Sequence, residues 1–134
     1  MNNLQLNEKA FDILKKVFGF SNYRYGQQEI VENIISGKQS LAIMPTGAGK
    51  SLCYQLPAII SQKQTIIISP LIALIDDQVA GLKECGVNVE KLHSNQTSDE
   101  RATSWYNFKV GKAKLLYVSP ERLMTENMID NLKL

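Results

Sequence analysis

The stretch LAIMPTGAGKS, residues 41–51, is the most informative part of this sequence. Its first four residues are apolar and predict a buried strand, and a helix is predicted to begin at Lys50. The glycines in the turn between them allow backbone angles that let N–H groups point inward. A helix N-terminus adds a partial positive charge. The stretch therefore predicts a strand, a turn and a helix arranged to bind an anion.

The lysine and serine that close this turn specify the anion. Lys50 is placed to reach the β- and γ-phosphates of a nucleotide, and the Ser51 hydroxyl to hold Mg²⁺. We therefore predict Lys50 and Ser51 as catalytic residues, with Ser51 as the metal contact. The strict pattern G-x-x-x-x-G-K-[ST] fails at its first position, where Met44 stands. A glycine-rich turn that binds nothing is the alternative, but GxGKS is seldom accidental between a strand and a helix.

The remaining sequence alternates helix-like and strand-like segments. A first helix is predicted over residues 8–17 with Asn7 as its N-cap, and a second over residues 26–35. A capping box at Thr97–Glu100 opens a later helix, and Pro120 suits the first turn of another. Strands are predicted at residues 65–69, 87–92 and 114–118, the first covered on both faces. This alternation of strands and helices predicts an α/β fold with a parallel sheet and flanking helices.

Composition and charge exclude several classes of protein. The chain has 134 residues, 44% hydrophobic and 21% charged, as expected of a soluble globular domain or part of one. A net charge of +2 is too weak to indicate a nucleic-acid partner by itself. No apolar run approaches the ~18 residues of a membrane span, and the polar first residues lack the layout of a signal peptide. We expect a soluble cytoplasmic protein.

Four ordered segments carry a resemblance to a known family. MPTGAGKS (residues 44–51) resembles motif I of superfamily 2 helicases. SPLIALIDDQV (69–79) resembles motif Ia of the RecQ branch, LLYVSPERL (115–123) resembles its motif Ib, and FGFSNYRYGQQEI (18–30) resembles its motif 0. These segments cover residues 11–124, nearly the whole chain. The sequence therefore resembles a RecQ-type helicase, with a P-loop NTPase (RecA-like) parallel sheet.

The resemblance implies an ATP site with Mg²⁺. A glutamine amide can pair with adenine N6 and N7, so Gln27 suits adenine, while Phe20 would stack on the ring and Arg24 would add a planar contact. Without the resemblance, the favoured interpretation of Phe20 is a core aromatic and that of Gln27 is a solvated polar residue. Family members usually carry Phe and Pro where Tyr23 and Tyr25 stand. The implied ATP-binding residues are Phe20, Arg24, Gln27, Met44, Pro45, Thr46, Gly47, Ala48, Gly49, Lys50 and Ser51.

The resemblance also implies contacts with DNA. Motifs Ia and Ib follow two predicted strands, at the carboxyl edge where α/β sheets bind ligands. Contacts to the phosphodiester backbone position a single strand without reading its sequence. For Gln78 and Arg122 an equal alternative is that each is an ordinary exposed polar residue of a helix. For Trp105 a place in the core is favoured over stacking on a base, and for His93 a structural role is favoured. The implied DNA-binding residues are Ser69, Leu71, Gln78, Ser119 and Arg122.

The family pattern contains parts that this sequence does not reach. The DExH box follows the strand after motif Ib, and zinc binds only in the family's C-terminal region. We expect residues 1–38 to form N-terminal helices with motif 0, and residues 39–134 to form the P-loop core with motifs I, Ia and Ib. Together they would be the N-terminal part of the first RecA-like domain, truncated before the DExH strand. Such a piece is expected to be inactive alone and to self-associate through its incomplete sheet.

The expected function of the intact protein follows from the resemblance. It is an ATP-dependent 3′-to-5′ DNA helicase that unwinds DNA in recombination and repair, in the cytoplasm at the bacterial nucleoid. Alternatives are another superfamily 2 translocase such as an RNA helicase, a nucleic-acid-binding module with a dead ATPase site, and a small P-loop kinase. The SPL and SPERL segments favour the DNA branch. DNA structure preference, partner proteins and oligomeric state are left open.

Overall fold

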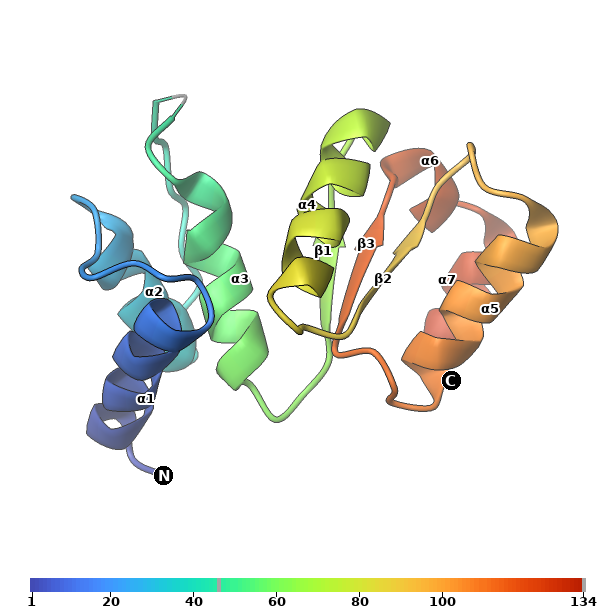
Figure 1. Cartoon of the computed structure of the whole chain (residues 1–134). Coiled ribbons are helices and arrows are strands. Elements are labelled where there is room, and N and C mark those ends of the chain that lie inside the picture. Colours follow the sequence, from blue (N-terminus) through green and yellow to red (C-terminus); the bar gives the residue numbers. More distant parts are fainter. Residues whose placement is uncertain (46, 134) are drawn as a thin grey trace. The chain divides into compact units, whose positions relative to one another are not determined.

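The computed structural model describes residues 1–45 and 47–133, and it divides into two compact units, Met1–Gln62 and Lys63–Leu134. The first unit contains α1 (Asn3–Lys16), α2 (Gln27–Ile35) and α3 (Lys50–Ile60). The second contains β1 (Thr65–Ile68), α4 (Ile72–Glu84), β2 (Val89–Leu92), α5 (Ser98–Lys109), β3 (Leu115–Val118), α6 (Pro120–Leu123) and α7 (Glu126–Leu132) (Figure 1). The predicted α/β class is confirmed.

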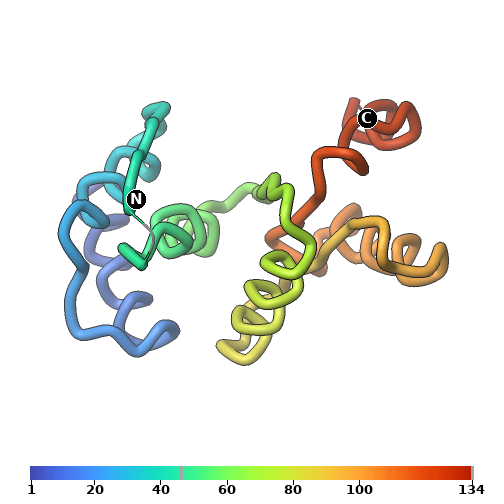
Figure 2. The backbone as a smooth tube through the Cα atoms, turned by 90° about the horizontal axis from the view of Figure 1, so that it is seen from above, coloured from blue at the N-terminus to red at the C-terminus, as the bar shows by residue number. Residues whose placement is uncertain are grey.

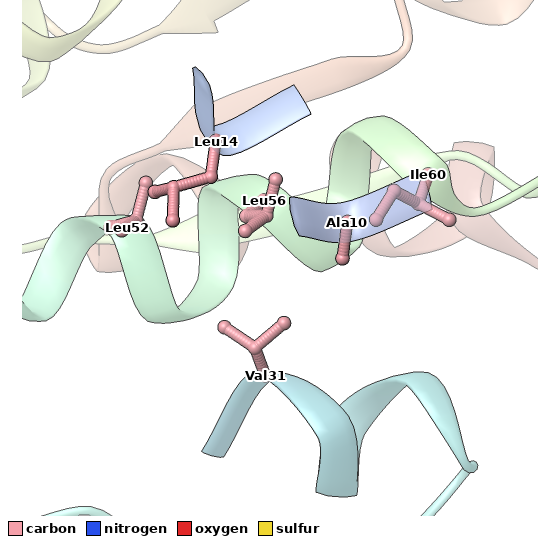
Figure 3. Packing of buried hydrophobic residues seen from close by; sticks show 6 residues of the cluster. All are labelled: Ala10, Leu14, Val31, Leu52, Leu56 and Ile60. Carbon is pink, nitrogen blue, oxygen red and sulfur yellow. The ribbon is translucent and has the colours of Figure 1, made fainter. Parts of the chain in front are cut away.

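The first unit is held together by a small apolar core. Its fully or nearly fully buried side chains come from all three helices and follow helical spacing. Figure 3 shows the labelled side chains of α1 and Val31 of α2 directed toward α3 from opposite sides. The core consists of Ala10, Leu14, Val31, Leu52, Leu56 and Ile60. These contacts fix the ends of α2 and α3, between which the glycine-rich turn lies.

Helix α1 begins earlier than the sequence pattern predicted. Its N-cap is Asn2, whose side-chain oxygen accepts from the Gln5 N–H at 2.9 Å, while the Gln5 side chain accepts from the Asn2 N–H at 3.0 Å. This reciprocal cap satisfies two donors at the helix start, so helix begins before Asn7. The prediction of Asn7 as N-cap was wrong.

Residues 41–44 do not form the predicted buried strand. Leu41 and Ile43 are both 90% exposed, and residues 38–45 form neither helix nor strand and run as an extended stretch of chain (Figure 2). A strand is stable only beside a partner that completes its hydrogen bonds. Within the described residues the sheet consists of β1, β3 and β2, and residues 41–44 are not among its strands. The apolar pattern therefore belongs to an extended segment that pairs with no strand among the described residues.

The second unit is a parallel three-stranded sheet with the order β1-β3-β2. All four residues of the central strand β3 are buried. Asp76 of α4 contacts Lys91, whereas Asn107 of α5 contacts Glu90, and adjacent residues of a strand point to opposite faces. Helices α4 and α5 therefore cover opposite faces of the sheet (Figures 1 and 2).

Strand β1 is less covered than predicted. Its residues are half-buried and Ile68 is 55% exposed, because β1 is an edge strand of the sheet that the structure describes. The other predicted strands and the capping box at Thr97 are confirmed, with reciprocal bonds of 3.1 and 3.2 Å between Thr97 and Glu100. Helix α7 was not predicted. None of the described helices is long and apolar enough to cross a lipid bilayer.

Candidate functional site

The turn before α3 has the backbone of an anion site. Gly47 and Gly49 have φ angles of +83° and +78°, which favour glycine. Gly49 is the N-cap of α3 and no side chain caps the helix, so N–H groups of the first turn are left for a ligand. Lys50 is exposed and Ser51 is half-buried at this helix start. Thr46, also predicted to bind ATP, lies outside the described residues.

Two residues of the motif 0 segment bind this turn directly. The Arg24 guanidinium donates from Nη1 to the carbonyl oxygen of Gly47 at 2.9 Å. The Gln27 amide donates from Nε2 to the carbonyl oxygen of Gly49 at 3.0 Å and accepts from the Arg24 N–H at 2.8 Å. Both residues bind carbonyl groups of the turn, and within the turn the Ala48 N–H donates to the Pro45 carbonyl at 3.2 Å. Gln27 is only 3% exposed, so the alternative of a solvated glutamine was wrong.

A cavity of about 610 Å³ borders the same turn. Its walls include Arg24, Tyr25 and Ile30, and the turn residues Pro45 and Ala48. The volume falls within the range of about 300–1,000 Å³ that is usual for small-molecule sites. Phe20 is 47% exposed, so the alternative that it is a core aromatic was wrong. It does not line this cavity, and its stacking on adenine stays a prediction.

A buried thiol supports the turn from inside the unit. The Cys53 sulfur lies 3.9 Å from the carbonyl oxygen of Gly49 and 4.0 Å from the Met44 sulfur. Burial raises the pKa of the Cys53 thiol, so it stays protonated at neutral pH. Met44, which replaces the first glycine of the strict pattern, therefore packs against the residue that lies beneath the turn.

The second unit brings the predicted motif Ia and Ib residues to the ends of adjacent strands. The Ser69 N–H donates to the Val118 carbonyl at 3.1 Å, just after β1. Ser119 follows β3, is 2% exposed, and accepts from the Arg122 N–H at 3.3 Å, so its hydroxyl caps α6. Leu71 is the N-cap of α4 and is 61% exposed, so it does not belong to the core. Gln78 and Arg122 are half-buried.

A cluster around His93 was not predicted from the sequence. Asp76 accepts from Lys91 Nζ at 2.6 Å and lies 2.8 Å from His93 Nε2. The other ring nitrogen of His93, Nδ1, accepts from the Asn95 N–H at 3.2 Å, so the proton is on Nε2 and is donated to Asp76. The hydrogen bond from Lys91, followed by that from His93, lowers the pKa of Asp76. The available signal was the spacing of Lys91 in β2 and His93 just after it, but this spacing does not identify Asp76 as their partner.

Comparisons with known proteins bear on this site. The family model described as DEAD/DEAH box helicase matches residues 24–134. The chain is 46% identical over 122 residues to the ATP-dependent DNA helicase RecQ of Pasteurella multocida, covering 91% of this chain and 19% of that protein. It is 42% identical over 122 residues to RecQ of Bacillus subtilis, covering 90% and 21% respectively. The chain thus spans about a fifth of the length of these curated relatives.

A more distant relative and a solved structure agree with this picture. The RecQ-like DNA helicase blm-1 of Caenorhabditis elegans is 37% identical over 128 residues, covering 94% of this chain and 13% of that protein. The crystal structure of a hypothetical ATP-dependent RNA helicase from Sulfolobus tokodaii superposes with a TM-score of 0.71, covering 100% of this chain and 38% of that chain. At 18% identity this likeness shows the fold alone.

Proposed function

Because the chain belongs to the DEAD/DEAH box helicase family, we propose that it supplies the ATP-binding turn and part of the strand-binding surface of a RecQ-type DNA helicase. The intact protein would unwind DNA in the 3′-to-5′ direction, in recombination and repair, in the cytoplasm. Sequence identities of 37–46% to several proteins named RecQ or RecQ-like DNA helicase favour a DNA helicase over an RNA helicase or a kinase.

One observation carries the nucleotide part of the proposal. The turn with two left-handed glycines opens onto an uncapped helix, and Arg24 and Gln27 fix its carbonyl groups. The N–H groups of the first turn of α3, which no side chain caps, suit phosphate oxygens. This arrangement fits a nucleoside triphosphate better than a neutral ligand.

The residues present also fit the role of each part of the nucleotide. The exposed Lys50 ammonium would bind the β- and γ-phosphates, and the Ser51 hydroxyl would hold Mg²⁺. Mg²⁺ neutralises charge on the phosphates during transfer. Gln27 and Phe20 are the proposed adenine contacts; neither lines the cavity beside Arg24, so the adenine would lie outside that cavity. Zinc, by the RecQ resemblance, would belong to a region outside this sequence.

We propose that the surface that binds the DNA strand lies at the carboxyl ends of β1 and β3. Ligands of open α/β sheets bind at this edge, and Ser69 and Ser119 lie there on neighbouring strands. We propose that residues 1–38 and 39–134 are the N-terminal helices and the P-loop core of the first RecA-like domain. The proposed DNA contacts are Ser69, Leu71, Gln78, Ser119 and Arg122.

ATP hydrolysis by the whole gene product that contains this chain tests the proposal. We expect single-stranded DNA to raise the hydrolysis rate at least about tenfold, and the stimulation to weaken as salt rises, because phosphate contacts release counterions. Single-stranded RNA of matched length is the control and is expected to stimulate far less. Stimulation by RNA alone would favour an RNA translocase, and hydrolysis indifferent to both would contradict the helicase proposal.

The exposed segment at residues 41–44 leads to a second proposal, self-association of the 134-residue chain. Its backbone has no ladder partner among the described residues, and the Leu41 and Ile43 side chains are exposed. An extended segment with unpaired backbone groups is a template for pairing with another chain. Sedimentation is expected to show dimers or larger species that Ile43→Lys converts to monomer. Leu4→Lys, at another exposed apolar position of the same unit, is the control. A monomeric parent chain would contradict the proposal.

A further inference from the structure

A small cationic cavity lies at the carboxyl end of β2, among α5, α6 and α7. Its volume is about 180 Å³, and Leu92, the last residue of β2, forms part of its wall. Figure 1 shows α5 and α7 near one another beside the sheet, with α6 at the end of β3. In the part of the chain that the structure describes, no acidic residue lines the cavity. Its polar and aromatic wall consists of Ser98, Arg101, Trp105, Arg122, Asn127 and Asn131.

Arg101 is held in place before any ligand arrives. Its guanidinium donates from Nη1 to the Gln96 carbonyl and from Nη2 to the Ser98 hydroxyl at 3.4 Å. Gln96 is itself 8% exposed, donates to the Lys91 carbonyl at 3.0 Å and accepts from the His93 N–H at 2.9 Å. The loop after β2 therefore positions this arginine, and within the described residues its guanidinium makes two hydrogen bonds out of the five that its N–H groups allow. A preorganised guanidinium loses little entropy on binding an anion.

Arg122 adds a second positive charge to the same cavity from another element. It lies on α6, and its backbone N–H is fixed by the Ser119 hydroxyl at 3.3 Å. Two guanidinium groups on one cavity wall favour an anion with several oxygens, such as a phosphate, because charge-assisted hydrogen bonds are the strong ones. The amides of Asn127 and Asn131 provide further donors and acceptors on the wall.

Trp105 gives the cavity an aromatic wall that is anchored in the core. Its ring packs against the cluster around Phe108 and Leu116, with its centroid 6.0 Å from that of Phe108. The side chain is nevertheless half-exposed and lines the cavity. A rigid aromatic beside arginines is the combination with which proteins bind single strands without sequence preference.

We propose that this cavity binds one nucleotide unit of a single DNA strand. The phosphate lies between Arg101 and Arg122, and the base stacks on Trp105. A volume below the usual range of about 300–1,000 Å³ suits one such unit rather than a whole cofactor. The inference rests on the proposed function, because it places a further contact, from α5, on the same strand. It adds Arg101 and Trp105 to the residues named for motifs Ia and Ib.

The fluorescence of Trp105 tests this inference directly, because it is the single tryptophan of the chain. Titration of the 134-residue chain with oligothymidylate is expected to quench the emission, since a stacked base contacts the indole. Arg101→Gln is expected to weaken the apparent affinity about tenfold, the effect of losing one charge-assisted hydrogen bond to a phosphate. Lys109→Gln removes one positive charge from the exposed end of the same helix and is expected to change the affinity less than about twofold.

A second readout separates this inference from the proposed function. Binding is followed in parallel by the anisotropy of a labelled oligothymidylate, which does not depend on Trp105. Binding without quenching, or quenching that Arg101→Gln does not weaken, would overturn the cavity assignment and leave the DNA-binding proposal intact. Absence of binding in both readouts would count against both. Displacement of the strand by thymidine monophosphate at equal concentration would also overturn the inference, because the site would then be one for free nucleotides.

Discussion

Replacement of Lys50 by alanine is expected to lower ATP turnover by the whole gene product at least about a hundredfold, the usual cost of removing one group that stabilises charge in the transition state. Lys50 is the first residue of α3 and is exposed beside the turn that the two glycines form. Its ammonium is therefore available to the terminal phosphates, and no other lysine adjoins the turn in sequence. Steady-state hydrolysis with saturating single-stranded DNA measures the effect.

Two companion variants show that the loss reflects position and geometry. Lys38→Ala removes the same charge from an exposed site of the same unit and is expected to leave turnover unchanged. Lys50→Arg keeps the charge but replaces a compact ammonium by a planar fork, so we expect turnover to remain strongly reduced. Turnover of Lys50→Ala within about threefold of the parent would remove the P-loop from the mechanism.

Features of the fold that depend on neighbouring residues in the sequence were predictable. The capping box at Thr97 and Glu100, the start of α3 at Lys50 and the start of α6 at Pro120 all formed as expected. Each is determined by hydrogen bonds or dihedral preferences within one turn of helix. The β-branched and apolar pattern likewise located β1 and β3 to within one residue.

Features that depend on distant partners were not predictable. The apolar pattern of residues 41–44 is that of a buried strand, but burial and pairing require neighbours, and Leu41 and Ile43 are exposed. Strand β1 is only half-buried for the same reason, since its position at the sheet edge is a property of the sheet order. A sequence pattern gives the conformation that a segment favours, whereas its surroundings come from the whole fold.

The candidate site divides in the same way. The turn and its glycines are local, so their backbone angles follow from the motif. The bonds from Arg24 to Gly47 and from Gln27 to Gly49 join residues more than twenty positions apart, and only the resemblance brought these segments together beforehand. The Asp76 and His93 contact and the cavity around Arg101 had no such guide, because they depend on which helix covers which face of the sheet.

Replacement of Gly49 by alanine is expected to weaken ATP binding by the 134-residue chain roughly thirtyfold or more. A left-handed backbone costs a residue with a Cβ about 1–2 kcal/mol. The new Cβ would also overlap the Gln27 Nε2 atom, so the bond from Gln27 to this turn must break, at a cost of about 1 kcal/mol. The two costs lower the population of the binding-competent turn, and each 1.4 kcal/mol weakens the affinity about tenfold. Titration with a fluorescent ATP analogue measures the change.

Gly47→Ala separates the two contributions to this loss. Gly47 has a similar φ of +83°, but a Cβ there would meet no atom within 4 Å, so only the backbone cost applies and a loss of roughly tenfold is expected. Gln27→Ala removes the side chain with which the new Cβ of Gly49→Ala collides. In that background Gly49→Ala should therefore cost no more than Gly47→Ala does alone, because the two substitutions share one contact. Equal losses from Gly47→Ala and Gly49→Ala in the parent chain would instead show that Gln27 does not hold the turn in its binding conformation.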